Sequence, residues 1–130
     1  MIVVDASVLA PALGDDGADG QRARHRLASE RLFAPEIVDL EVGSVWRRAV
    51  RARRLDPRRA LQALADLRAL PLARAPHLPL MARVWELRDN LTPYDAAYVA
   101  LAEAIPAPLV TADQRLAAAP GIGCEIALLR

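Results

Sequence analysis

The chain has 130 residues, of which 54% are hydrophobic, and its formal net charge at pH 7 is +1. This composition excludes a disordered segment, and the length predicts a single domain over residues 1–130 with its own core. So small a net charge gives no general attraction to nucleic acid. All 17 basic residues are arginine, which excludes any chemistry that needs a catalytic lysine.

A single cysteine, Cys124, offers neither an internal disulfide nor a zinc site, and this is typical of a reducing compartment. No uncharged run approaches the length of a membrane-spanning helix. The first residues include Asp5 and no basic leader, so they do not resemble a signal peptide. We therefore expect a cytoplasmic protein that is not bound to a membrane.

The first half of the chain alternates short apolar runs with helical patterns. Ile2, Val3 and Val4 form an apolar run without alternation, as in a strand buried on both faces. Apolar residues from Val38 onward recur at helical spacing, with arginines largely off that stripe. The predicted elements are strands at 2–4 and 32–34, helices at 6–13, 21–31 and 36–54, and a loop at 14–20.

The second half continues the alternation. Asp56 and Pro57 have the residue types that begin a helix, as N-cap and first helical residue. The predicted elements are helices at 57–69, 77–90, 92–105 and 113–119, and strands at 71–73, 109–111 and 122–128. Strands that alternate with helices indicate an α/β fold with a mostly parallel sheet.

Four acidic residues stand where the predicted elements would direct them toward one point. Asp5 and Asp113 follow short β-branched runs, and ligands of open parallel sheets bind at the carboxyl ends of strands. Asp95 begins a helix, and Glu41 lies on or beside the apolar face of another. Converging carboxylates stay ionised only beside a cation. The simplest candidate is Mg²⁺ or Mn²⁺, which prefer oxygen ligands, and this indicates metal-assisted phosphoryl chemistry.

Helix capping is a simpler account of three of these acids. Asp5, Asp95 and Asp113 each stand at a predicted helix start, where Asp side chains accept backbone hydrogen bonds. Glu41 lies within a helix and has no capping role there. The set of four favours a shared site, because independent caps need not face one cleft.

Hydroxyl and guanidinium groups add supporting candidates. Ser7 stands two residues after Asp5, where its hydroxyl would help to hold a metal-bound water or a phosphate, and Thr111 occupies the matching place before Asp113. Seven arginines lie between positions 47 and 59. A solvated helix face is the simplest account of them, and phosphate contacts with RNA are the functional alternative. The candidate RNA contacts are Arg47, Arg51 and Arg54.

Four segments in order resemble the PIN-domain ribonucleases, and in particular the VapC-type toxins of toxin–antitoxin pairs. They are Ile-Val-Val-Asp-Ala-Ser at 2–7, the Pro-to-Glu segment at 35–41, Tyr-Asp-Ala-Ala-Tyr-Val-Ala-Leu-Ala at 94–102 and Leu-Val-Thr-Ala-Asp at 109–113. Each segment alone is weak, but four at suitable separations are specific. The resemblance covers the whole chain.

The resemblance implies a three-layer α/β/α domain around a central, mostly parallel sheet of four or five strands. It implies an endoribonuclease that depends on Mg²⁺ or Mn²⁺ and hydrolyses RNA phosphodiester bonds with a metal-activated water. Asp5, Asp95 and Asp113 are then metal ligands, and Glu41 binds a second metal or orients the water. It also implies a VapB-type antitoxin as partner, a homodimer, and a hetero-oligomer with the antitoxin.

Other classes of protein place acids in similar positions. Receiver domains and haloacid-dehalogenase-like phosphatases both require a lysine, which this chain lacks. An RNA-processing PIN nuclease unrelated to toxicity, or a non-catalytic PIN-fold module that binds RNA or protein, remain as alternatives. Metal-dependent cleavage and growth arrest on expression would separate them.

Overall fold

A five-stranded parallel sheet forms the centre of the structure, a computed structural model that describes residues 1–130. The strands lie in the order β3-β2-β1-β4-β5. They are β1 (Ile2–Val4), β2 (Leu32–Pro35), β3 (Leu72–Ala75), β4 (Leu109–Thr111) and β5 (Ile126–Leu128). The chain builds outward from β1 to β3 and then returns to β4, so strand order reverses between β1 and β4. This reversal is where ligands of open parallel sheets bind.

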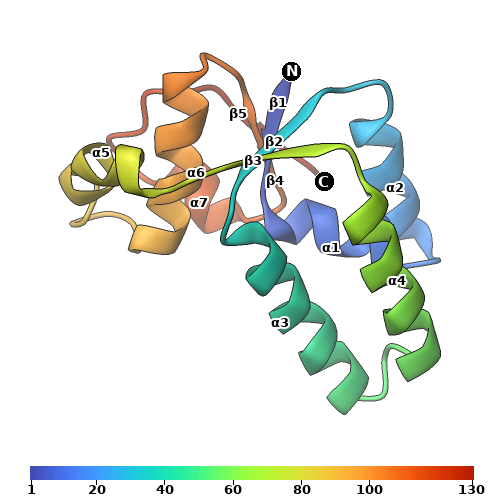
Figure 1. Ribbon diagram of the computed structural model, residues 1–130. Coiled ribbons are helices and arrows are strands. Elements are labelled where there is room, and N and C mark those ends of the chain that lie inside the picture. The colour runs from blue at the N-terminus through green and yellow to red at the C-terminus, as the bar shows by residue number, and fades with distance from the viewer.

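Helices cover both faces of the sheet, which confirms the predicted three-layer α/β/α architecture. They are α1 (Ala6–Gly14), α2 (Ala18–Leu27), α3 (Val38–Arg51), α4 (Pro57–Ala69), α5 (Met81–Glu86), α6 (Pro93–Ala104) and α7 (Gln114–Ala118), with a 3₁₀ turn at Leu78–Leu80. In Figure 1, α5 and α6 lie on one side of the sheet and α1 and α2 on the other, while α3 and α4 form a hairpin that extends away from it. None of the helices is long and apolar enough to cross a membrane.

The hydrophobic core lies between the sheet and helices α1 and α6. All three residues of β1 are buried, and every residue of α6 from Ala96 to Ala102 is buried as well. This agrees with the sequence, in which α6 is apolar almost all round. Because both elements are fixed by burial on several sides, they provide a rigid support for the side chains at their ends.

Helix α2 begins at Ala18, so the predicted loop at 14–20 is wrong in its second half. The carboxylate of Asp15 accepts hydrogen bonds from the amides of Gly17, at 3.0 Å, and Gly20, at 2.9 Å. It therefore caps α2 from outside the helix. Gly20 lies against the Asp15 carbonyl so closely that a Cβ would come within 1.8 Å of that oxygen. Of the glycines that predicted a loop, Gly20 is required by this close approach.

Other element boundaries also differ from the prediction. Helix α3 begins at Val38 and not at 36, because the Glu36 amide still donates to the Ala75 carbonyl at 3.0 Å and extends the pairing of β2 with β3. The predicted helix at 77–90 is a 3₁₀ turn followed by α5, which ends at Glu86. Strand β5 occupies only 126–128 of the predicted 122–128.

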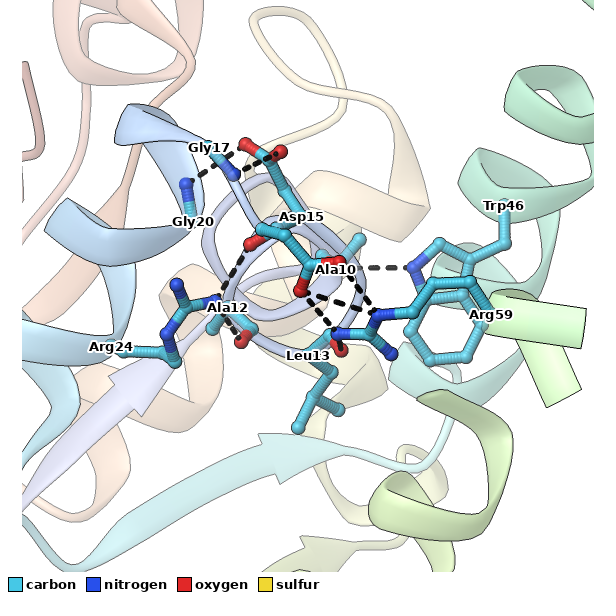
Figure 2. A network of polar contacts seen from close by, with 10 residues as sticks. Ala10, Ala12, Leu13, Asp15, Gly17, Gly20, Arg24, Trp46 and Arg59 are labelled. Carbon is cyan, nitrogen blue, oxygen red and sulfur yellow. Dashed lines mark hydrogen bonds and ion pairs between the residues drawn. The ribbon is translucent and has the colours of Figure 1, made fainter. Parts of the chain in front are cut away.

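The carboxyl end of α1 is held by donors from three other helices (Figure 2). The indole of Trp46 donates to the Ala10 carbonyl at 3.1 Å. Arg24 Nη1 donates to the carbonyls of Ala12, at 3.1 Å, and Asp15, at 2.7 Å. Arg59 Nη2 donates to the Leu13 carbonyl at 2.9 Å. The last carbonyls of a helix lack partners within it, so these donors fix α1, whose other end carries Asp5.

Candidate active site

Asp5 joins the central strand to α1 and is only 7% exposed. It is the N-cap of α1, and one carboxylate oxygen accepts from the Ser7 amide at 3.1 Å and the Ser7 hydroxyl at 2.5 Å. The Thr111 hydroxyl donates to the other oxygen at 2.5 Å. Burial raises the pKa of Asp5 to about 6, although these hydrogen bonds act in the opposite direction. Asp95 raises it slightly further.

The hydroxyls of Ser7 and Thr111 join the ends of β1 and β4. Thr111 is completely buried, and its hydroxyl accepts from the Asp113 amide at 3.0 Å while it donates to Asp5. The Ser7 hydroxyl accepts from the Ala112 amide at 2.8 Å. Both hydroxyls are therefore engaged within the protein. Their position holds the Asp5 carboxylate and the backbone before Asp113 in fixed places.

Glu41, in α3, meets Tyr98, in α6. The Tyr98 hydroxyl donates to Glu41 Oε1 at 2.5 Å, and Tyr98 is itself buried. Burial raises the pKa of Glu41, the Tyr98 hydrogen bond opposes this, and Asp95 adds to it. The pKa of Tyr98 is raised by its own burial and by Glu41. The carboxylate on the apolar face of α3 thus has a neutral hydroxyl as partner, and Oε2 has no protein partner.

Asp95 and Asp113 differ in how far capping explains them. The Thr92 hydroxyl accepts from the Asp95 amide at 3.2 Å, so Thr92 caps α6 and the Asp95 carboxylate is not needed there. Burial raises the pKa of Asp95, and Asp113 raises it further. Asp113 does cap α7, because its carboxylate accepts from the amides of Arg115, at 2.9 Å, and Leu116, at 3.4 Å.

One cavity of about 300 Å³ brings the four predicted acids together. It is lined by Asp5, Ala6, Ser7, Glu41, Ser44, Val45, Arg48, Asp95, Tyr98 and Asp113. The charge of Asp95 raises the pKa of both Asp5 and Glu41, and the charge of Asp113 raises the pKa of Asp95. Asp5 and Asp113 therefore cap helices and also line the shared cavity.

The side chains that line the cavity are chemically suited to bind a divalent cation. The negatively charged side chains around the cavity are all carboxylates, and hard cations such as Mg²⁺ prefer oxygen ligands. In the rotamers of the structure, no three or more His, Cys, Asp or Glu side chains converge closely enough to form a metal site. The hydroxyls of Ser7 and Thr111 hold Asp5 in place. The side chains of Asp95, Glu41 or Asp113 would therefore have to move for three carboxylates to coordinate one cation.

Three polar lining residues were not among the sequence candidates. Tyr98 lies three residues after Asp95, and Ser44 and Arg48 lie three and seven residues after Glu41, on the same faces of their helices. This spacing places them near the acids, but only the packing of α3 and α6 shows that they line the cavity. Arg47 and Arg51 are exposed and line none of the main cavities, whereas Arg54 lines a neighbouring one.

Sequence comparison connects this site to characterised proteins. A family model described as the PIN domain matches residues 2–122, which include all four acids. Ribonuclease VapC1 of Mycobacterium tuberculosis is 46% identical over 129 residues, which cover 98% of this chain and 97% of that protein. Ribonuclease VapC9 of the same organism is 45% identical, with 99% and 98% covered.

Solved structures share the fold. VapC20 of Mycobacterium tuberculosis, described as a sarcin-ricin loop cleaving toxin, matches with a TM-score of 0.67 over 91% of this chain and 94% of that one. It is 21% identical, so this likeness concerns the fold alone. PAE2754 from Pyrobaculum aerophilum matches with a TM-score of 0.65 and 28% identity, over 90% of this chain and 84% of that one.

Proposed function

Because the chain belongs to the PIN-domain family and is a VapC-type toxin endoribonuclease, we propose that the acidic cavity is its active site and requires Mg²⁺ or Mn²⁺. The observation that carries this proposal is the meeting of Asp5, Glu41, Asp95 and Asp113 in one cavity at the strand-order reversal. Asp5, Asp95 and Asp113 would hold the cation. When bound, a divalent cation lowers the pKa of a water ligand and neutralises the leaving 3′ oxygen.

The remaining chemistry belongs to the side chains themselves. The raised pKa of Glu41 makes its carboxylate a better proton acceptor, as a general base for the attacking water requires. The Tyr98 hydroxyl holds Oε1 and leaves Oε2 available to that water, or to a second cation. Ser7 and Thr111 keep Asp5 in one orientation, so this carboxylate does not have to reorganise when the cation or the substrate binds.

The partners of this site are proposed from the family to which the chain belongs. RNA is the proposed substrate, and a VapB-type antitoxin is the proposed inhibitor. An arginine of the antitoxin, placed among the four carboxylates, would supply positive charge and exclude the metal. We also propose a homodimer, and a hetero-oligomer with the antitoxin. Expression of the chain without antitoxin should stop growth, and Asp5→Asn should restore it, which an RNA-processing enzyme unrelated to toxicity would not produce.

The test is metal-dependent RNA cleavage by the purified chain. Cleavage should occur with Mg²⁺ or Mn²⁺, stop in EDTA, and fall at least a hundredfold in Asp95→Asn. The metals should also raise the melting temperature, because a ligand at a hundredfold its dissociation constant stabilises the folded state by about 2.7 kcal/mol. Asp95→Asn should lose most of that shift.

Asp89→Asn is the matched control, because Asp89 is exposed and lies outside the cavity. It should cleave RNA and respond to metal like the wild type. Equal cleavage in EDTA would refute the metal requirement, and full activity of Asp95→Asn would refute the assignment of the site.

A further inference from the structure

Arg48 is the only cationic side chain that lines the acidic cavity. Its guanidinium Nη1 donates to the Ser44 hydroxyl at 3.0 Å, one turn earlier in α3. Arg48 takes part in none of the ion pairs of the structure, although four carboxylates line the same cavity. It is exposed, so its charge is available to a molecule that enters from solvent.

A second cavity, of about 560 Å³, continues from the first along α3. The two share Ser7, Val45 and Arg48, so Arg48 stands at their junction. The second cavity runs past Trp46 and Ala49 to Arg54 at the far end of the helix. Together they form one depression that leads from the acids to the end of α3.

The second cavity is lined by two acids and by two arginines, Arg48 and Arg54, and neither arginine takes part in an ion pair. Of its two acids, Asp15 is engaged in capping α2 and Asp19 is paired with Arg22. Arg54 has no ion pair, and its place is fixed by the end of α3. There the Arg54 amide donates to the Ala49 carbonyl at 2.8 Å and the Arg53 amide to the Val50 carbonyl at 3.0 Å, with Arg53 at a φ of 58°. This is a Schellman turn.

We propose that Arg48 binds the RNA phosphate next to the reaction centre, and that the strand leaves the acidic cavity along α3 toward Arg54. The proposal rests on the proposed function of the acidic cavity. Of the three sequence candidates, Arg54 is kept in this proposal, whereas Arg48 takes the place of Arg47 and Arg51, which line neither cavity. A guanidinium suits this role because it remains charged and offers paired donors to phosphate oxygens.

The experiment compares Arg48→Gln with Arg47→Gln, an adjacent exposed arginine on the same helix. Steady-state cleavage of a single-stranded oligoribonucleotide should show KM raised at least tenfold in Arg48→Gln, with kcat changed less than KM. Arg47→Gln should stay within twofold of the wild type. Arg48→Lys should recover part of the loss, and Arg54→Gln should raise KM by a smaller factor that multiplies with that of Arg48→Gln.

Binding without turnover gives a second readout. In the Asp95→Asn background, anisotropy of a labelled oligoribonucleotide should show weaker binding after Arg48→Gln. The slope of log K against log salt should be smaller by about 0.7, the value for one phosphate contact with a single strand. Arg47→Gln should leave the slope unchanged.

The outcomes separate the two proposals. If the wild type cleaves RNA with metal but Arg48→Gln behaves like Arg47→Gln in both assays, the role of Arg48 is refuted and the active-site assignment stands. If cleavage does not depend on metal while Arg48→Gln alone weakens binding and reduces the salt slope, the function proposal fails and the phosphate contact stands.

Discussion

At the scale of single residues, the burial of Asp5 makes the free energy of unfolding depend on pH. Its folded pKa of about 6 lies above the ordinary value of 3.8, so the folded state holds the proton more tightly than the unfolded chain does. This contributes stability that is fully present below pH 4 and is lost as the pH rises through 6. The maximum contribution is about 3 kcal/mol, from 1.4 kcal/mol for each pH unit between the two values.

Asp5→Asn should therefore unfold at higher denaturant concentration than the wild type at pH 8 in EDTA, because the amide carries no charge to bury. The advantage should shrink between pH 6 and pH 4 and be nearly absent at pH 4. Urea unfolding of both proteins at several pH values measures it. The same comparison with Asp89→Asn, which removes an exposed carboxylate outside the cavity, is the control for the loss of one negative charge. A constant difference for Asp5→Asn would show that burial does not perturb its ionisation.

The four acids were predictable because each follows a feature that is visible in the sequence, such as the end of an apolar run or the start of a helix. The Glu41–Tyr98 pair was not, since it joins two helices across 57 positions and depends on how they pack. Arg48 was missed for a related reason. Seven arginines in one stretch look alike in sequence, and only the packing of α3 shows which of them lines the cavity.

At the scale of elements, the capped end of α1 should be measurable in stability. Arg59→Gln removes the donor to the Leu13 carbonyl and the positive charge at the helix terminus, so it should cost about 1–2 kcal/mol. Arg58→Gln is the control, because the Arg58 side chain is exposed and only its backbone amide is engaged. Chemical unfolding compares the two. Equal stability would show that solvent satisfies the Leu13 carbonyl just as well.

The strands and most helices were predictable from local patterns, and the failures share one cause. At α2 the cap is Asp15, which stands outside the helix and reaches back across two glycines, so the Gly-rich segment looked like a loop. At α3 the first residues remain paired with β3, which is distant in sequence. In both cases the segment is a helix, as the local pattern predicts. Contacts from outside the segment place the start of the helix at a different residue from the predicted one.

At the scale of the whole molecule, burial predicts where the structure opens last. All of β1 and the segment of α6 from Ala96 to Ala102 are buried, whereas α5 has one buried residue, Val84, and an exposed Trp85. Amide hydrogen exchange should be slowest in β1, β4 and α6 and several orders of magnitude faster in α5, since local opening needs less energy where fewer apolar contacts are broken. Mass spectrometry of exchanged peptides measures this. Similar rates in α5 and α6 would mean that the domain opens as one unit.

The hydrogen bond between Thr111 and Asp5 joins residues 106 positions apart in the chain. Asp5 leaves the ribosome early in translation, but Asp95, Thr111 and Asp113 follow near the end. A nascent chain therefore has no complete acidic cavity for most of the time it spends attached to a ribosome. A chain that ends before residue 111 lacks both Thr111 and Asp113, so it can form neither the hydrogen bond to Asp5 nor the full set of four carboxylates. The order of the strands thus delays completion of the cavity until synthesis is nearly finished.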